Sequence, residues 1–280
     1  MYLRRFPASG RGEISKAIWR DGSVSGKLYM VGTPIGNLGD ITVRAIDTLK
    51  SVDFIAAEDT RVTRGLMTHF DIRKPLVSYY EHNAAHSGEA IISRLLSGES
   101  CALVADAGMP AVSDPGGSLV QLCADAGVKV EAVPGPSALT CAMALSVLPV
   151  GRFCFEGFLS TAKKSRRKHL EGIKSECRTM VFFEAPHKLK NTLGDLLLTL
   201  GDRRITVCRE LTKLHEQVLH TTLKDALDYF AETPPRGEFV LLVEGASQPE
   251  NDGFEDEIGS LVMSQPAAAY GTQHAKPGRK

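Results

Sequence analysis

The sequence lacks the cysteine spacing of a metal or redox site. Six cysteines occur among its 280 residues, but all lie far apart, so neither a CxxC pair nor a Cys/His zinc-ligand set is present. Isolated cysteines of this kind behave as small apolar residues. We therefore expect reduced thiols in the core and no metal centre.

Long hydrophobic runs are also missing. The most apolar stretch, residues 138–150, is interrupted by Thr140, Ser146 and Pro149 and is shorter than the roughly 20 residues that a membrane-spanning helix needs. Residues 1–26 carry several basic side chains without an apolar segment, so they lack the pattern of a secretory signal. The sequence therefore predicts a cytoplasmic protein that contacts no membrane.

An excess of charge of one sign is absent too. Lys and Arg total 33, as do Asp and Glu, so the formal net charge of +0 favours neither nucleic acid nor an anionic surface as a partner. With 43% hydrophobic and 24% charged residues, the composition is that of an ordinary globular protein. A chain of 280 residues is long enough for two domains, each with its own core.

What the sequence does contain is a regular alternation. From residue 27 onward, short apolar runs alternate with amphipathic helical patterns, which predicts an α/β fold with largely parallel sheets and more hairpin-like spacing in the second half. We expect strands at residues 28–31, 54–57, 76–79, 101–105, 128–133, 153–155, 179–183, 205–209, 217–221 and 239–243. We expect helices at residues 42–50, 60–70, 87–96, 117–126, 137–148, 164–174, 188–200 and 223–230.

This pattern also predicts a division into domains. It restarts after Pro134 and ends near Ala246, where the sequence becomes polar and then basic. The predicted segments are a flexible N-terminal extension (1–26), an N-terminal α/β domain (27–134), a C-terminal α/β domain (135–246) and a polar, largely disordered tail (247–280).

Three loops rich in Gly and Pro each follow a predicted strand and precede a predicted helix. They are residues 32–37, 106–117 and 133–138. Ligands of α/β sheets bind at such strand ends, where backbone amides and helix N-termini converge, so we expect the loops to surround one cleft. Neither GxGxxG nor GxxxxGKS/T is present, so the loops indicate neither a dinucleotide fold nor a P-loop. The structural alternative is turns with helix N-caps from Ser113, Asp114 or Ser137.

Charged residues stand at strand ends in the second half. Glu184 follows a buried strand and could act as a general base or contact adenosine, and an interdomain ion pair accounts for it equally well. The same alternatives hold for His187. For Arg209 and Glu210, an ion pair is favoured over a catalytic role.

The neutral total hides one basic run. It consists of Lys163, Lys164, Arg166, Arg167 and Lys168. Together with Arg61 and Arg64, this run favours contact with nucleic-acid phosphates over a merely solvated face. Tyr79, Tyr80 and His82 are of the kind that stack on and bond to unpaired bases, although packing of a half-buried strand accounts for the tyrosines equally well.

Seven motifs occur in the order and spacing of one protein family. They are residues 31–38 (VGTPIGNL), 58–61 (EDTR), 80–83 (YEHN), 106–110 (DAGMP), 113–116 (SDPG), 133–138 (VPGPSA) and 183–187 (FEAPH). Through them, residues 27–246 closely resemble the branch of the tetrapyrrole methylase superfamily that methylates small-subunit ribosomal RNA. The sequence departs from the usual pattern of this branch at Met109, Tyr80 and Lys188, which stand in place of threonine, histidine and arginine.

This resemblance implies a fold and an activity. Members are two-domain α/β homodimers, each domain a mostly parallel or mixed sheet flanked by helices, with S-adenosylmethionine bound in the interdomain cleft. They methylate the ribose 2′-hydroxyl of a cytidine in the decoding region of 16S rRNA in the small ribosomal subunit, and the reaction requires no metal. Two alternatives stay open. One is another enzyme of the superfamily, which methylates a tetrapyrrole carbon (uroporphyrinogen or precorrin type) or a protein carboxylate, and the other is a non-catalytic homologue that binds RNA or the ribosome.

The resemblance and the residue patterns together give a candidate site. The residues implied to bind the cofactor are Pro34, Ile35, Asp106, Gly108, Met109, Val112, Ser137, Ala138, Phe183, Glu184, Leu211, Gly237 and Glu238. The candidate RNA contacts are Arg61, Arg64, His82, Lys163, Lys164, Arg166, Arg167, Lys168, His187 and Lys188. Since a ribose hydroxyl is a weak acid that needs a base or a hydrogen-bond acceptor, the candidate catalytic carboxylates are Glu81, Asp106 and Glu184.

Overall fold

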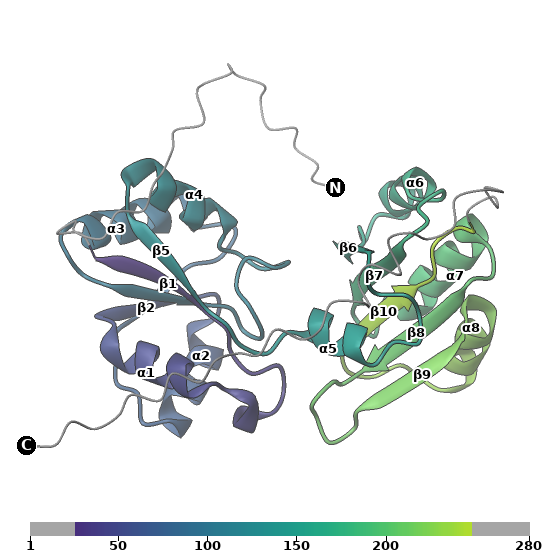
Figure 1. The fold of residues 1–280 in the computed structure, drawn as a ribbon, viewed down its shortest axis with the longest axis horizontal. Coiled ribbons are helices and arrows are strands. Elements are labelled where there is room, and N and C mark those ends of the chain that lie inside the picture. Colours follow the sequence, from purple (N-terminus) through teal and green to yellow (C-terminus); the bar gives the residue numbers. More distant parts are fainter. Residues whose placement is uncertain (1–25, 248–280) are drawn as a thin grey trace, which may run out of the picture. The chain divides into compact units, whose positions relative to one another are not determined.

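Figure 1 shows the computed structural model of the chain, which describes residues 26–247. Its strands form two five-stranded sheets. The first consists of β1 (Lys27–Val31), β2 (Phe54–Ala57), β3 (Leu76–Ser78), β4 (Cys101–Val104) and β5 (Lys129–Val133). All of its strand pairs are parallel, in the order β3-β2-β4-β1-β5.

Helices cover both faces of the first sheet. They are α1 (Val43–Ser51), α2 (Thr60–His69), α3 (Ala84–Leu96) and α4 (Gly117–Ala126), with a short 3-10 helix, η1 (Leu38–Asp40), after β1. Alternate strand residues point to opposite faces, so Leu28 and Met30 share a core with α3 and α4, whereas Val31 shares one with α1 and α2. Figure 1 shows these two helix pairs on opposite sides of the sheet. Burial on both faces explains why the strands are continuous apolar runs in the sequence.

The second sheet is mixed. It consists of β6 (Phe153–Phe158), β7 (Thr179–Glu184), β8 (Arg204–Arg209), β9 (Gln217–Thr222) and β10 (Phe239–Val243), in the order β6-β7-β10-β8-β9. β6 and β7 are parallel, and the other pairs are antiparallel. Helices α6 (Lys163–Gly172), α7 (Leu189–Leu200) and α8 (Leu223–Glu232) contribute to the core on one face, and α5 (Ala138–Ala144) contributes to the other.

The predicted α/β fold class is confirmed, and the predicted strands and helices are present with shifted ends. The helix expected to reach residue 148 ends at Ala144. The residue before Pro149 is biased away from helix, and Leu148 N donates instead to Ser146 Oγ (3.1 Å) in a turn. Strand β6 is longer than expected, because a bulge at Gly157, whose φ is +62°, interrupts the alternation.

The predicted domain boundary, after residue 134, falls between β5 and α5, where the chain passes from the first sheet to the second. The division into domains stays a prediction. The predicted N-terminal extension and C-terminal tail lie outside the described residues, apart from Gly26 and Ser247.

All six cysteines lie in the described part of the chain, and none is in a disulfide. Cys101, Cys123 and Cys208 are buried, as expected for core thiols. Cys177 is exposed, so the expectation is wrong there, because this residue lies in the loop between α6 and β7. Within residues 26–247, no helix combines the length and apolar character needed to cross a membrane.

Candidate functional site

The three Gly/Pro loops meet at the carboxyl ends of β1, β4 and β5. Thr33 N donates a hydrogen bond to Gly108 O (2.9 Å), and Gly108 N donates one to Thr33 O (3.1 Å). Gly32 and Gly135 are in backbone contact, since a Cβ at Gly32 would lie 2.7 Å from Gly135 Cα. The expected convergence of the loops is therefore confirmed.

The sheet topology explains why a cavity forms here. β1 and β4 are neighbours, yet the helix after β1 packs on one face and the helix after β4 packs on the other. At such a switch point the loops diverge and leave a crevice at the strand ends. A cavity of about 490 Å³, a size typical of small-molecule sites, is lined there by residues of both halves of the chain. We call it the cleft cavity.

Most residues implied to bind the cofactor line the cleft cavity. These are Ile35, Asp106, Gly108, Met109, Val112, Ser137, Ala138, Phe183, Glu184, Leu211 and Glu238. Pro34 lines a neighbouring cavity of about 320 Å³, which also contacts Ile35 and Asp106. Gly237 is in neither lining. Ser137 precedes α5 but makes no capping hydrogen bond with its side chain, so its hydroxyl is available to the cavity. The binding role of the set stays a prediction.

Other lining residues were missed. They are Glu58, Asp114, Phe158, Ala185, Pro186, Phe239 and Val240. Glu58 directly follows β2, so its place at a strand end was an available signal. Asp114 was considered only as a helix cap, but Gly116 precedes α4 and no side chain caps it. Phe158, which is 53% exposed, follows the bulge that hid the end of β6.

Five carboxylates line the cleft cavity, those of Glu58, Asp106, Asp114, Glu184 and Glu238. The first three lie close enough for their charges to affect one another. Burial and then the charges of Glu58 and Asp106 raise the pKa of Asp114 to about 6. Burial also raises the pKa of Glu58 and that of Asp106, although Asp59 N donates a hydrogen bond to Asp106 Oδ1 (3.0 Å). Crowded carboxylates of this kind favour a bound cation.

Two segments beside the cavity have strained backbones. Ala111 and Ser113 have φ values of +69° and +68°, and Glu210 and Thr212 have values of +51° and +66°. Non-glycine residues rarely adopt such angles, at a cost of about 1–3 kcal/mol each, and they gather at ligand sites. The Thr212 hydroxyl is also buried and has no hydrogen-bond partner among the described residues. The strained segments flank Val112 and Leu211, two residues of the cavity lining.

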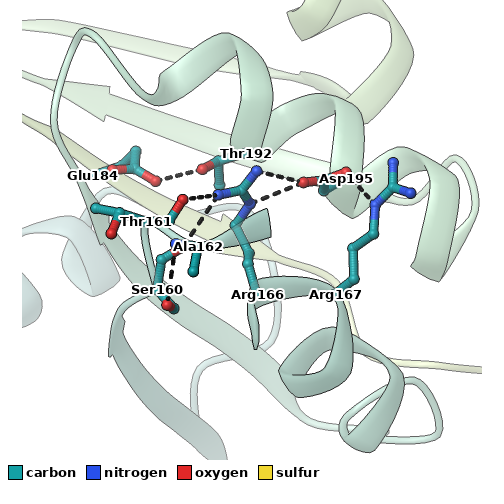
Figure 2. A network of polar contacts seen from close by, with 8 residues as sticks. All are labelled: Ser160, Thr161, Ala162, Arg166, Arg167, Glu184, Thr192 and Asp195. Atoms are coloured by element: carbon teal, nitrogen blue, oxygen red, sulfur yellow. Dashed lines mark hydrogen bonds and ion pairs between the residues drawn. The ribbon is translucent and has the colours of Figure 1, made fainter. Parts of the chain in front are cut away.

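Glu184 is buried and hydrogen-bonded, and among the described residues it is not paired with a basic side chain. It is 3% exposed, and its carboxylate accepts hydrogen bonds from Ala185 N (2.8 Å) and from the Thr192 hydroxyl of α7. Figure 2 shows the bond to Thr192. The interdomain ion pair considered for Glu184 is therefore not formed within the described residues.

The expected Arg209–Glu210 ion pair is also replaced by other contacts. Glu210 binds Lys213 Nζ (2.8 Å), while Arg209 Nε donates to Arg236 O (2.6 Å). Burial opposes ionisation of Glu210, but hydrogen bonds from Lys213 and from the backbone of Glu238 outweigh it and lower the pKa of Glu210.

A second cavity, of about 680 Å³, lies beside α6 and α7. We call it the basic groove; it is lined by Thr161, Lys163, Arg166, Arg167, His187, Lys188, Lys190, Asn191, Gly194, Asp195 and Leu227. Five predicted RNA contacts thus lie together, while Lys164 and Lys168 are exposed on α6 outside the lining.

The remaining candidates lie elsewhere. Tyr79 is buried and its hydroxyl is 2.7 Å from Ser118 Oγ, so the packing alternative holds for this tyrosine. Arg61 pairs with Asp59 (2.6 Å) on α2, where Arg64 is also exposed. The structure does not bring the exposed Glu81 or His82 into the cleft cavity. Among residues 26–247, no group of His, Cys, Asp or Glu has the arrangement of a metal site.

Comparison with known proteins agrees with this geometry. Residues 27–227 match the Tetrapyrrole (Corrin/Porphyrin) Methylases. The chain is 51% identical over 220 residues to the Ribosomal RNA small subunit methyltransferase I of Halalkalibacterium halodurans, covering 79% of this chain and 76% of that protein. It is 49% identical over 245 residues to the protein of the same name from Bacillus subtilis, covering 88% of this chain and 84% of the relative.

A solved structure shares the fold at much lower identity. The cobalt precorrin-4 methyltransferase, described as a cobalamin biosynthetic enzyme, matches with a TM-score of 0.60 and 19% identity over 78% of this chain and 94% of that chain. That match concerns the fold alone. The family match and the close relatives each span most of the chain. The chain therefore belongs to the tetrapyrrole methylase family.

Proposed function

We propose that this protein is an S-adenosylmethionine-dependent methyltransferase that modifies the ribose 2′-hydroxyl of a cytidine in the decoding region of 16S rRNA. The observation that carries the proposal is the cleft cavity at the switch point of the first sheet, a largely apolar pocket in which the charges of Glu58, Asp106 and Asp114 affect one another. The relatives named Ribosomal RNA small subunit methyltransferase I support the choice of substrate. We further propose a cytoplasmic homodimer acting on the small ribosomal subunit.

The residues of the cleft cavity suit S-adenosylmethionine. This molecule carries a positive sulfonium and an ammonium group, and Glu58, Asp106 and Asp114 supply the opposite charge. Its adenine ring needs an apolar wall, which Phe183 and Leu211 provide. When bound, the cofactor supplies an activated methyl group.

The protein's own contribution is positioning and acceptance of a proton. Direct displacement at the methyl carbon requires the ribose oxygen to be held in line with the bond that breaks, and much of the rate comes from this geometry. Of the three candidate carboxylates, Glu184 has its oxygens engaged by Ala185 and Thr192, and Glu81 is outside the cavity. Asp106 lines the cavity and has only Oδ1 bonded to Asp59, so we assign it as acceptor of the hydroxyl proton.

The test is transfer of labelled methyl from S-adenosylmethionine to purified 30S subunits that lack the modification, followed by nucleoside mapping. A labelled 2′-O-methylcytidine in the decoding region is the expected result. Cofactor binding without label in RNA would instead favour a tetrapyrrole or protein substrate or a non-catalytic ribosome-binding role. Asp106→Asn provides the inactive control, because it keeps the size of the side chain but removes the base.

A further inference from the structure

The basic groove is unusually rich in positive charge for a neutral protein. Its lining includes five Lys or Arg, at positions 163, 166, 167, 188 and 190, and a single carboxylate, that of Asp195. Among the described residues, no acidic side chain pairs with Lys163 or Lys188. The groove therefore presents uncompensated charge within a concave surface.

Asp195 neutralises only the interior of the groove. Figure 2 shows its carboxylate between Arg166, which donates from Nε (2.9 Å) and Nη2 (2.6 Å), and Arg167, which donates from Nε (2.8 Å). Arg166 is 7% exposed and its Nη1 donates to Ser160 O and Thr161 O, so its donors are used inside the protein. Arg167 has 42% of its side chain exposed, and its terminal nitrogens point away from Asp195. Arg166 therefore orients Asp195 from inside the protein. Arg167 is a partly exposed cation whose position is fixed by its bond to Asp195.

The N-termini of helices α6 and α7 lie at this groove, and both carry lysines where acidic residues are usual. A helix N-terminus carries partial positive charge and favours acidic residues, yet α6 begins at Lys163 and α7 is preceded by Lys188 and continues with Lys190. Neither helix has an acidic residue in its first turn or a side-chain cap. Breaches of local preference are expected where function requires them. An external anion would satisfy both the lysines and the backbone N–H groups.

The groove and the cleft cavity share one segment of chain. Ala185 and Pro186 line the cleft cavity, and the next two residues, His187 and Lys188, line the groove. Helix α7 also contacts both, through Thr192 to Glu184 and through Asp195 to Arg166 and Arg167 (Figure 2). A polymer bound in the groove would therefore lie close to the cleft cavity.

We propose that the basic groove binds backbone phosphates of the RNA strand next to the target nucleotide. Lys163, Arg167 and Lys188 make the phosphate contacts, and Arg166 and Asp195 are positioning residues. This inference rests on the proposed function, because RNA is the polyanion that such a methyltransferase must hold. The contacts fix the register of the strand and carry no base specificity.

The test compares two full-length triple variants with the wild type. Lys163→Gln/Arg167→Gln/Lys188→Gln removes three charges from the groove. Arg44→Gln/Lys50→Gln/Arg152→Gln removes three charges from exposed positions outside both cavities. Binding to 16S rRNA is measured as a function of salt, S-adenosylmethionine binding by calorimetry and folding by thermal unfolding.

Each phosphate contact contributes about 0.7–0.9 to the slope of log K against log salt, so the groove variant should lose about 2 from this slope. Its affinity for RNA should fall at least 10-fold at physiological salt, with cofactor affinity unchanged, while the control variant binds as the wild type does. Its Tm should fall only slightly, because Arg167→Gln removes one hydrogen bond to Asp195 while Arg166 keeps its two. Equal slopes for wild type and groove variant would overturn the proposal. So would an equal loss in the control variant, or competition by polyglutamate as effective per charge as competition by RNA.

The outcome can be separated from failure of the proposed function. The RNA-binding measurement does not depend on catalysis, and methyl incorporation is measured with the wild-type protein alone. A wild-type protein that binds RNA through the groove but transfers no methyl would contradict the proposed function alone. If the groove variant methylates 30S subunits with the KM of the wild type, the role of the groove is contradicted and the proposed function is not.

Discussion

At the scale of single residues, Asp114 has a raised pKa whose effect on stability can be tested. Its pKa rises from 3.8 to about 6 because of burial and then the charges of Glu58 and Asp106, so folding favours its protonated form. The stability of the protein should therefore fall, through this group, as pH rises from about 4 to about 6, and stay level above that.

Asp114→Asn removes this charge. We expect it to raise the free energy of unfolding at pH 7 by about 1 kcal/mol after allowance for solvent screening, or Tm by about 2–4 °C, and to leave stability at pH 4 unchanged. Affinity for S-adenosylmethionine should fall several-fold. Thermal unfolding and calorimetry across pH check both, and parallel pH profiles for variant and wild type would contradict the assignment.

Asp106 and Glu81 form a matched pair of tests for the proton acceptor. Asp106→Asn should reduce turnover at saturating S-adenosylmethionine by about 10²-fold or more, since a general base contributes about 10²–10⁴. Its cofactor affinity should fall only several-fold, as for Asp114→Asn, because each variant removes one carboxylate from the cleft cavity. Glu81→Gln should keep turnover near that of the wild type, because Glu81 lies outside the cleft cavity. Single-turnover methyl transfer measures both. The reverse pattern would make Glu81 the base.

The contact between Gly32 and Gly135 excludes even a methyl group. In Gly135→Ala, the new Cβ would lie 2.8 Å from the Cα, C and O atoms of Gly32, so the loops must separate. We expect a loss of about 1–3 kcal/mol in stability and a loss of cofactor binding. Gly117→Ala is the control, because its Cβ would meet nothing within 4 Å. Calorimetry and thermal unfolding distinguish the two, and an unchanged cofactor affinity in Gly135→Ala would show that the loops tolerate separation.

At the scale of secondary structure, α7 organises two regions through Thr192 and Asp195. Asp195 lies 5% exposed between Arg166 and Arg167, and hydrogen bonds from Arg167 and Arg166 outweigh the effect of burial and lower its pKa. The pair therefore stabilises the fold above the ordinary pKa of an aspartate, and this contribution is lost as pH falls.

Asp195→Asn would leave the buried guanidinium of Arg166 without its counter-charge. We expect a loss of about 3–5 kcal/mol in the free energy of unfolding at pH 7, measured by urea denaturation. Asp71→Asn, which breaks an exposed ion pair with Arg73, should cost under about 1 kcal/mol. Similar losses for both variants would show that burial adds nothing to the Asp195 pair.

The elements were predictable where a pattern depends on neighbours in the sequence. Strands of the first sheet are apolar throughout because both faces are covered, and this leaves a clear signal. The end of β6 was not predictable, because a bulge at Gly157 shifts the register. The Asp195–Arg166 pair was also hidden, since nothing in the sequence of α6 tells which of its arginines turns inward.

The site was predictable in part for the same reason. Loops at strand ends converge by topology alone, which brought Asp106, Met109 and Ser137 to one cavity. The partners of Glu184 depend on how α7 packs against β7, which no motif specifies.

At the scale of the whole molecule, the fold and the chemistry are separable. The cobalt precorrin-4 methyltransferase shares the architecture at 19% identity, and a shared fold at that level does not determine the substrate. What distinguishes this chain must lie in surfaces such as the basic groove. We expect the phosphate contacts proposed for this groove, rather than the sheets, to give the protein its preference for RNA.

The cleft cavity is lined by residues from Ile35 to Val240. Contacts of such wide sequence separation form late, after the intervening chain has been ordered. During synthesis, the ribosome must therefore complete almost all of the described chain before a pocket exists. A fragment released before residue 239 would lack part of the cavity lining, so under the proposed function we expect it to bind no methyl donor.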